Sequence, residues 1–292
     1  MTSTLNTDID RAQFGRDWDT WHRAHETHRA DPLGFFAITG LHWLGSEPIA
    51  LPGAPGTWSL GLGADGVVVE LAEGESLTLD GATITGRHAF GELPERSSLT
   101  PGFTAGDVAG AVEIAQRGGH TILRPRRADH PFLAEYPGTP TYVPNPRWRV
   151  AARFRPFDAP RPTEVGAAVD GLTHVYDAPG VLEFSWRGDH FTLTAFDGKA
   201  PGDLLVLFTD ATSGLTTYAA NRSVGVDAPD ADGWTTIDFN RAVNLPCAYT
   251  DFATCPLPPE GNRLPIGIEA GEKTPLTRVR STDALVAPAV AA

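Results

Sequence analysis

The sequence predicts a mostly β fold of antiparallel sheets, sandwich or barrel-like, with one amphipathic helix at the N-terminus. Gly and Pro together make up 56 of the 292 residues, which favours many turns over long helices. Short β-type runs of period two recur from about residue 57 onward, separated by Gly or Asp-Gly. Hardly any helical pattern lies between these runs, so we expect antiparallel pairing rather than βαβ units. The length allows two packed β assemblies.

The first segment, 1–33, carries the one clear helical pattern. Aromatic and imidazole side chains recur there on one face: Phe14, Trp18, Trp21, His25 and His28. Thr7 or Asp8 is placed to cap the helix, and Asp31 ends it because the residue before a proline avoids the α region. We therefore expect a partly buried helix whose imidazoles lie at its solvent end.

The N-terminal β region, 34–123, opens with an apolar, glycine-bounded stretch at 34–45, which predicts a buried turn and a short strand. Short runs rich in β-branched residues follow, each bounded by turn signals. In this region we expect strands at 58–60, 67–71, 76–80, 82–85, 111–116 and 120–124.

A proline-rich connecting loop, 124–146, follows with six prolines, and loops of this length are usually functional or act as linkers. It is the predicted boundary to the C-terminal β region, 147–273. Strands are expected there at 147–155, 181–187, 190–197, 203–208, 215–219, 234–239 and 264–268. The tail, 274–292, is rich in Ala, Pro and Val without a period, so we expect it to be flexible.

Two predicted hairpins, 113–123 and 183–193, resemble each other. They match at Glu, Arg, Gly, His and Leu with a constant offset of 70 residues. A duplicated β unit would explain the match, and so would Arg-Gly-x-His as favourable turn chemistry that arose twice. The sequence leaves both explanations open.

Charge and composition exclude several classes of protein. The chain has 23 basic and 36 acidic residues, a net charge of −13, so we expect no nucleic-acid partner. No apolar run approaches the roughly 20 residues that span a bilayer, so we expect no membrane partner either. The polar, acidic start at 1–16 predicts a cytoplasmic protein. Nothing fixes the oligomeric state.

Polar residues of the kinds that active sites use concentrate between positions 238 and 272. Asp238 and Asn240 are two apart on a predicted strand and so share a face. We predict a polar small-molecule site here, with Asp238 and Glu269 as acid–base residues if the protein is an enzyme. The predicted ligand-binding residues are Asn240, Arg241, Asn244, Asn262, Arg263 and Glu272, with Asp210, Tyr218 and Arg222 as further walls.

This segment also resembles a known family. Asp-Phe-Asn-Arg-Ala at 238–242, Asn-x-Pro-Cys-Ala at 244–248, Thr-Cys-Pro-Leu-Pro-Pro at 254–259, Asn-Arg-Leu-Pro at 262–265 and Glu-Ala-Gly-Glu-Lys at 269–273 are similar to the C-terminal signature of domain of unknown function 1684. The resemblance covers roughly residues 15–273. It departs from the expected pattern at 221–223 and 244–247. It implies kinship, without a reaction or catalytic residues.

Two alternatives to a small-molecule site stay open. In the first, the protein is a non-catalytic structural or binding module, and 238–272 is a stabilising clasp that satisfies loop backbone groups. In the second it is a metal-assisted hydrolase that uses carboxylates and histidines. No spacing selects such ligands, because His22-x-x-His25-x-x-His28 lacks the pattern of zinc hydrolases, so we predict no metal residues.

Other motifs give little support for specific chemistry. Cys247 and Cys255 have neither a close Cys-x-x-Cys partner nor a neighbouring His, and we interpret them as small buried cysteines. No Gly-x-Gly-x-x-Gly follows a strand and no Walker lysine is present, so nucleotide and flavin cofactors have no support. The cofactor, like the reaction, is unassigned by the sequence.

Overall fold

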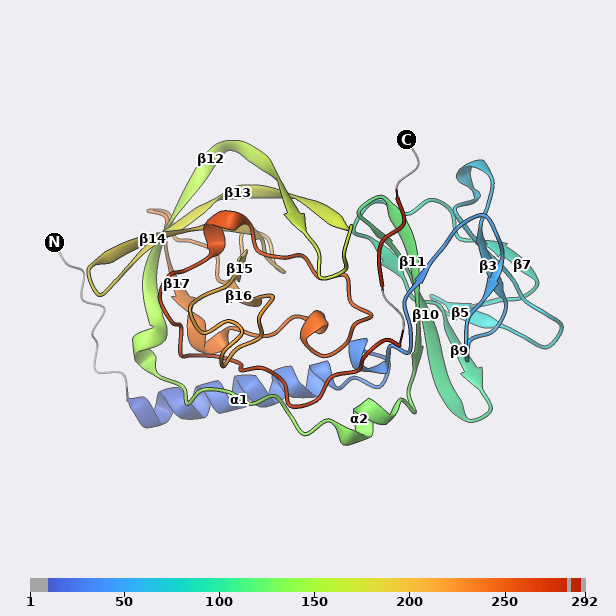
Figure 1. Ribbon diagram of the computed structural model, residues 1–292, viewed down its shortest axis with the longest axis horizontal. Coiled ribbons are helices and arrows are strands. Elements are labelled where there is room, and N and C mark those ends of the chain that lie inside the picture. The colour runs from blue at the N-terminus through green and yellow to red at the C-terminus, as the bar shows by residue number, and fades with distance from the viewer. Residues whose placement is uncertain (1–9, 283–284, 290–292) are drawn as a thin grey trace.

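Two β assemblies lie side by side in the computed structural model, which describes residues 10–282 and 285–289 (Figure 1). Their sheets are antiparallel, and one long helix precedes them. The predicted mostly β fold with an N-terminal helix is therefore confirmed. No helix in the described part of the chain is long and apolar enough to cross a bilayer.

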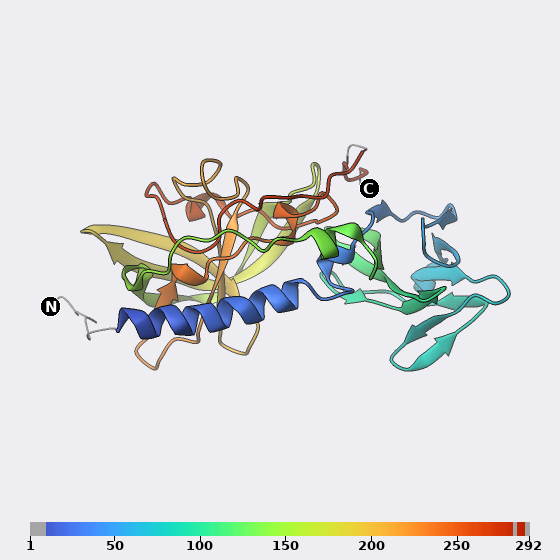
Figure 2. The same ribbon diagram turned by 90° about the horizontal axis from the view of Figure 1, so that it is seen from below.

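The long helix, α1 (Arg11–Arg29), runs beneath the C-terminal assembly (Figure 2). The Asp10 side chain caps it by accepting hydrogen bonds from the backbone N–H groups of Ala12 and Gln13. The predicted caps Thr7 and Asp8, like the rest of 1–9, lie outside the described residues. Trp18 and Arg29, eleven positions apart and so on one face, are the buried residues. His28, expected on that face, is exposed.

The N-terminal assembly consists of two sheets. The seven-stranded sheet contains β1 (His42–Trp43), β11 (His120–Arg127), β10 (Val108–Arg117), β9 (Gly102–Ala105), β5 (Leu77–Leu79) and β6 (Ala82–Ile84) in this order, with β8 (Ser98–Leu99) paired to β10. The four-stranded sheet contains β2 (Ile49–Ala50), β3 (Thr57–Leu60), β4 (Val67–Glu70) and β7 (Arg87–Ala89). Alternate residues of both sheets, among them Trp58, Leu77 and Ile114, form a shared core.

The C-terminal assembly is a six-stranded half-barrel. Its order is β16 (Arg222–Val226), β15 (Leu204–Phe208), β14 (Asp189–Asp197), β13 (Thr173–Trp186), β12 (Arg149–Gly166) and β17 (Trp234–Asp238). Residues of the following segment, including Phe239 and Ile268, pack on strand residues such as Leu182 and Phe208. The segment 239–273 therefore supplies the side of the core that the strands leave open (Figure 1).

The remaining helical elements are single turns in the connecting segments. They are α2 (Pro131–Glu135), η1 (Phe35–Ala37), η2 (Gly63–Asp65), η3 (Pro146–Trp148), η4 (Phe239–Arg241), η5 (Pro246–Ala248) and η6 (Glu260–Asn262). Because β11 extends to Arg127, the connecting loop begins four residues later than the predicted 124. The described part of the tail is held by backbone hydrogen bonds, from Val279 to Tyr249 and from Ala287 to Asp170.

Two predicted strands of the C-terminal region are wrong. Residues 215–219 lie in and after a turn, in which the N–H groups of Leu215 and Thr217 donate to the carbonyl of Thr212. Residues 264–268 are also irregular, because Pro265 has no N–H and the N–H of Ile268 donates to a carboxylate instead of a neighbouring strand. The alternation of apolar residues there reflects burial against the half-barrel.

The two similar hairpins differ in register. In β10–β11 the residues before and after the turn are Arg117 and His120. In β13–β14 the corresponding pair is Trp186 and Asp189, so the turn comes one residue earlier in the matched sequence. With the offset of 70 the pairing therefore shifts by two residues, and equivalent positions keep their face: Ile114 and Leu123 are buried in one hairpin, and Phe184 and Leu193 in the other. A duplicated unit and turn chemistry used twice both stay open as explanations of the match.

Candidate functional site

The segment 239–273 is held against the half-barrel by one buried ion pair. Arg222 pairs with Asp210 at 2.7 Å, and their side chains are 1% and 0% exposed. The same guanidinium donates to the backbone carbonyls of Ile268, Ala270 and Glu272. Asp210, in turn, accepts from the N–H of Ile268 at 3.2 Å. These two predicted wall residues hold the backbone of the segment.

The buried asparagines have the same role. Asn262 accepts from the N–H of Thr194 at 2.7 Å and donates to the carbonyls of Thr194 and Leu207. Asn240 bonds both backbone groups of Asn145. Asn244 donates to the carbonyl of Lys273 at 2.8 Å. Such contacts satisfy loop backbone groups that no sheet ladder reaches, as a clasp requires.

Asp238, which is partly buried, and the exposed Arg263 and Glu269 do not share one cavity. Asp238 caps η4 and lies 3.6 Å from Arg149 and 4.0 Å from Arg241, beside a hollow of about 210 Å³. Arg263 is exposed and follows η6. Glu269 lines a different hollow. Joint acid–base action of Asp238 and Glu269 stays a prediction.

The hollow beside Glu269 has a volume of about 360 Å³ and is called here the tryptophan hollow. Its lining is formed by Trp148, Trp186, Arg187, Asp189, Ile266, Gly267 and Glu269. The two indoles stack with their centroids 4.4 Å apart and their planes inclined by 15°. Asp189 and Glu269 are both exposed, so their carboxylates face solvent at the hollow. Asp189 directly follows the β13–β14 turn, in which Arg187 adopts a left-handed conformation (φ 53°).

A third cluster joins α1 to the end of the segment and was not predicted from the sequence as a unit. Arg29 donates to both carboxylate oxygens of Glu272, at 2.8 and 3.0 Å, across 243 residues of sequence. These side chains are 2% and 1% exposed. Arg29 also pairs with Glu26 at 2.7 Å, and the N–H of Asn244 donates to Glu272 at 2.6 Å. The periodic signal that indicated a buried face at Trp18 extends to Arg29.

Two imidazoles of α1 face the same carboxylates. His25 Nε2 lies 2.6 Å from Arg29, and since a guanidinium only donates, this nitrogen accepts. Burial and the charge of Arg29 lower the pKa of His25 to about 3. Burial also lowers the pKa of His22. His22 Nε2 is inaccessible to solvent and has no hydrogen-bond partner among the residues that the structure describes.

Burial also shifts the pKa values of the carboxyl and phenol groups of this cluster. It raises the pKa of Glu272 despite the opposing pull of Arg29, and it raises the pKa of Tyr249 well above its ordinary value. The Tyr136 pKa rises to about 12, because burial and a hydrogen bond to Glu26 both favour the neutral phenol. Two carboxylates, one guanidinium and neutral rings thus share a nearly closed space.

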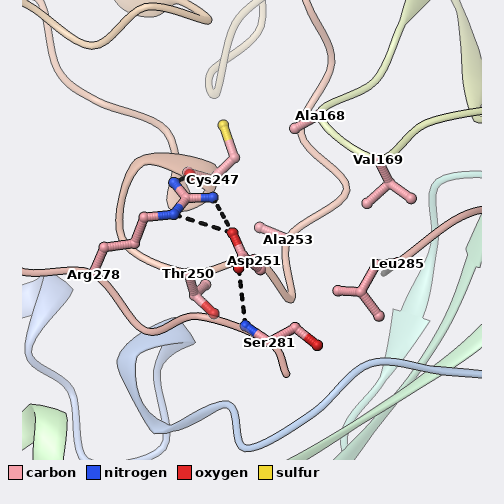
Figure 3. Close-up of a pocket in the computed structure, with 9 residues that line it drawn as sticks. All are labelled: Ala168, Val169, Cys247, Thr250, Asp251, Ala253, Arg278, Ser281 and Leu285. Atoms are coloured by element: carbon pink, nitrogen blue, oxygen red, sulfur yellow. Dashed lines mark hydrogen bonds and ion pairs between the residues drawn. The ribbon is translucent and has the colours of Figure 1, made fainter. Parts of the chain in front are cut away.

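The cysteines lie at the junction of the two assemblies. Cys247 and Cys255 are buried and unpaired, as interpreted from the sequence, and the N–H of Cys247 lies 3.3 Å from Cys255 Sγ. Cys247 borders a hollow of about 230 Å³, where Arg278 of the tail bonds Asp251 (Figure 3). Tyr218, a predicted wall residue, donates to the carbonyl of Cys247 at 2.8 Å. Arg278 of the tail donates to the same carbonyl.

Fold and site together define an antiparallel β protein whose half-barrel is completed by a clasped C-terminal segment. Residues 134–273 match the model of the family described as protein of unknown function (DUF1684), so the resemblance inferred from the motifs is confirmed over this stretch. Among solved structures, the solution NMR structure of an uncharacterized protein from Haloarcula marismortui is similar. The two sequences are 32% identical, the matched region covers 49% of this chain and 80% of that chain, and the TM-score is 0.41. A search of curated proteins found no match.

Proposed function

We propose that this protein binds a small organic cation in the tryptophan hollow. The observation that carries the proposal is the combination of stacked Trp148 and Trp186 with the exposed carboxylates of Asp189 and Glu269 around one hollow of about 360 Å³. Indole faces attract cations through the ring quadrupole, and carboxylates add Coulomb attraction. A volume of this size is at the lower end for small-molecule sites, so the ligand is small.

The protein supplies its own cation at this place, which supports the choice of ligand. The guanidinium carbon of Arg187 lies 5.8 Å from the Trp186 ring centroid. Arg187 is exposed at the tip of a two-residue turn, so its side chain has room to move aside. The net charge of −13 also favours the approach of cations over anions.

The proposal is tested by titrating the protein with choline chloride while its tryptophan fluorescence is recorded. We expect a saturable change, and none with glucose or with sodium chloride at equal ionic strength. Glu269→Gln combined with Asp189→Asn should weaken binding by up to about fivefold per carboxylate, since an exposed ion pair contributes at most about 1 kcal/mol. Glu183→Gln is the matched control, because Glu183 is an exposed carboxylate on β13 that pairs with Arg155 instead. Equal binding by the double variant, or an equal response to glucose, would contradict the proposal.

A second role is favoured by the contacts of Arg222 and the asparagines. In this role 238–272 is a stabilising clasp, and Asp210, Asn240, Asn244 and Asn262 serve the fold rather than a ligand. The two roles are compatible, because the carboxylates of the tryptophan hollow are exposed and the clasp residues are buried. An acid–base function of Asp238 or Glu269 is a further hypothesis that choline binding alone does not require.

We also propose that the protein works in the cytoplasm and without nucleic-acid or membrane partners. Its two buried thiols, Cys247 and Cys255, are unpaired, as is usual where the milieu keeps cysteines reduced. The acidic net charge opposes binding to phosphate backbones and to anionic lipid surfaces.

A further inference from the structure

The cluster between α1 and the clasp contains three metal-ligating side chains that converge from distant parts of the chain. His22 Nε2 lies 4.0 Å from Glu26 Oε1 and 4.0 Å from Glu272 Oε1. All three ligand atoms lie within 4.8 Å of one another. His22 and Glu26 are four apart on one helix face, and Glu272 is presented by the clasp. We propose that these residues bind one divalent transition-metal ion, with Zn²⁺ as the preferred ion.

The distances suit a zinc ion after a small adjustment. Zn–N and Zn–O bonds of about 2.0–2.2 Å place neighbouring ligand atoms of a tetrahedral site roughly 3.4 Å apart. Each His–Glu separation therefore has to shorten by about 0.6 Å. His22 is 16% exposed and its Nε2 has no hydrogen bond to the described residues, so the His22 side chain supplies this adjustment, whereas Glu26 and Glu272 are held by hydrogen bonds. One imidazole and two carboxylates form a ligand set that zinc accepts.

Two further observations point to a cation at this place. His22 Nε2 has no hydrogen-bond partner in the part of the chain that the structure describes, although it is inaccessible to solvent. A buried nitrogen without a partner is costly, and a metal ion would satisfy it. Among the residues that the structure describes, the two carboxylates share a single guanidinium, that of Arg29, so they outnumber the guanidinium groups of the cluster by one.

The surroundings would hold the ligands in place. The His22 ring stacks on the buried Trp18 at 4.6 Å with an interplanar angle of 10°, which sets the plane of the ring and leaves shifts within that plane. Arg29 bonds both Glu26 and Glu272, and would remain an outer partner that orients the two carboxylates. His25 is engaged with Arg29 and is therefore not one of the ligands in this proposal.

The test uses the full-length protein, treated with a chelator, dialysed, and titrated with Zn²⁺ in competition with a chromophoric chelator. We expect one tight equivalent in the wild type, and a rise of the melting temperature with Zn²⁺. His22→Gln and Glu26→Gln should each weaken binding by more than the roughly 10–100-fold that loss of a supporting residue costs. Circular dichroism of the variants without metal checks that they fold.

His28→Gln is the matched control, since His28 is an exposed imidazole on the same helix. It should leave the tight equivalent unchanged. Glu269→Gln should also leave it unchanged, because the metal cluster and the tryptophan hollow have no residue in common. Less than about 0.1 equivalent bound by the wild type at micromolar free Zn²⁺, or equal binding by folded His22→Gln and Glu26→Gln variants, would overturn the proposal.

Discussion

Replacing Arg222 by methionine removes the group on which the clasp depends. The change leaves the Asp210 carboxylate, whose side chain is 0% exposed, without its ion-pair partner, and it deprives three backbone carbonyls of a donor. Breaking a buried ion pair by removing one partner costs about 3–5 kcal/mol, largely because the remaining charge stays buried. We expect the free energy of unfolding to fall by this amount.

The measurement is urea denaturation at pH 7, followed by tryptophan fluorescence. Arg263→Met is the control, because Arg263 is an exposed arginine of the same segment, and its loss should change stability by no more than about 0.5 kcal/mol. Arg222→Met combined with Asp210→Asn removes the stranded charge as well, and should recover at least about 1 kcal/mol relative to the single variant.

A milder substitution tests the same ion pair if Arg222→Met is too unstable to purify. Arg222→Lys keeps the charge but loses the planar fork that bonds several carbonyls at once, so its stability should lie between those of the wild type and Arg222→Met. A loss below about 1 kcal/mol in Arg222→Met, or no recovery in the double variant, would refute the clasp.

Two other predictions concern buried groups outside the clasp. Arg124 and Arg126 outweigh the effect of burial and lower the pKa of Glu113 from 4.5 to about 2, so the carboxylate stabilises the fold above pH 4.5 and loses this effect as the pH falls toward 2. Glu113→Gln should cost about 3 kcal/mol at pH 7 and progressively less below pH 4.5, measured by urea denaturation across pH; a pH-independent cost would contradict this. Cys247 and Cys255, 1% and 7% exposed, should react with an aromatic disulfide reagent only after denaturation, and rapid reaction of two thiols in the folded protein would disprove their burial.

The parts of the fold that depend on local signals were predictable. The helical periodicity around Trp18 and the Gly-rich turns gave the helix and most strands, because these patterns report burial within a few residues of sequence. The strand at 264–268 was predicted in error from the same kind of signal. Leu264 and Ile266 bond the backbone of 209–211, but Pro265 has no N–H and both backbone groups of Ile268 bond the side chains of Asp210 and Arg222, so no regular strand forms.

The site could be predicted only as a list of residues. Asp210, Asn240, Asn262 and Glu272 stood out by type, yet their separate tasks depend on partners far away in sequence. Glu272 meets a helix residue 243 positions earlier, and Asn262 meets Thr194. No local pattern encodes such pairs, so the division between buried clasp residues and the exposed Glu269 became visible only in the fold.

The position of α1 bears on how the chain is divided into folding units. The helix is followed directly by the N-terminal assembly, yet Trp18 donates to the carbonyl of Asn240 at 2.6 Å and Arg29 bonds Glu272. The C-terminal unit is therefore discontinuous in sequence, with the N-terminal sheets inserted between its first helix and its strands. During synthesis, Arg29 of the helix can form its ion pair only after Glu272 has been added to the chain. A fragment cut to residues 134–273 would carry Glu272 without that arginine.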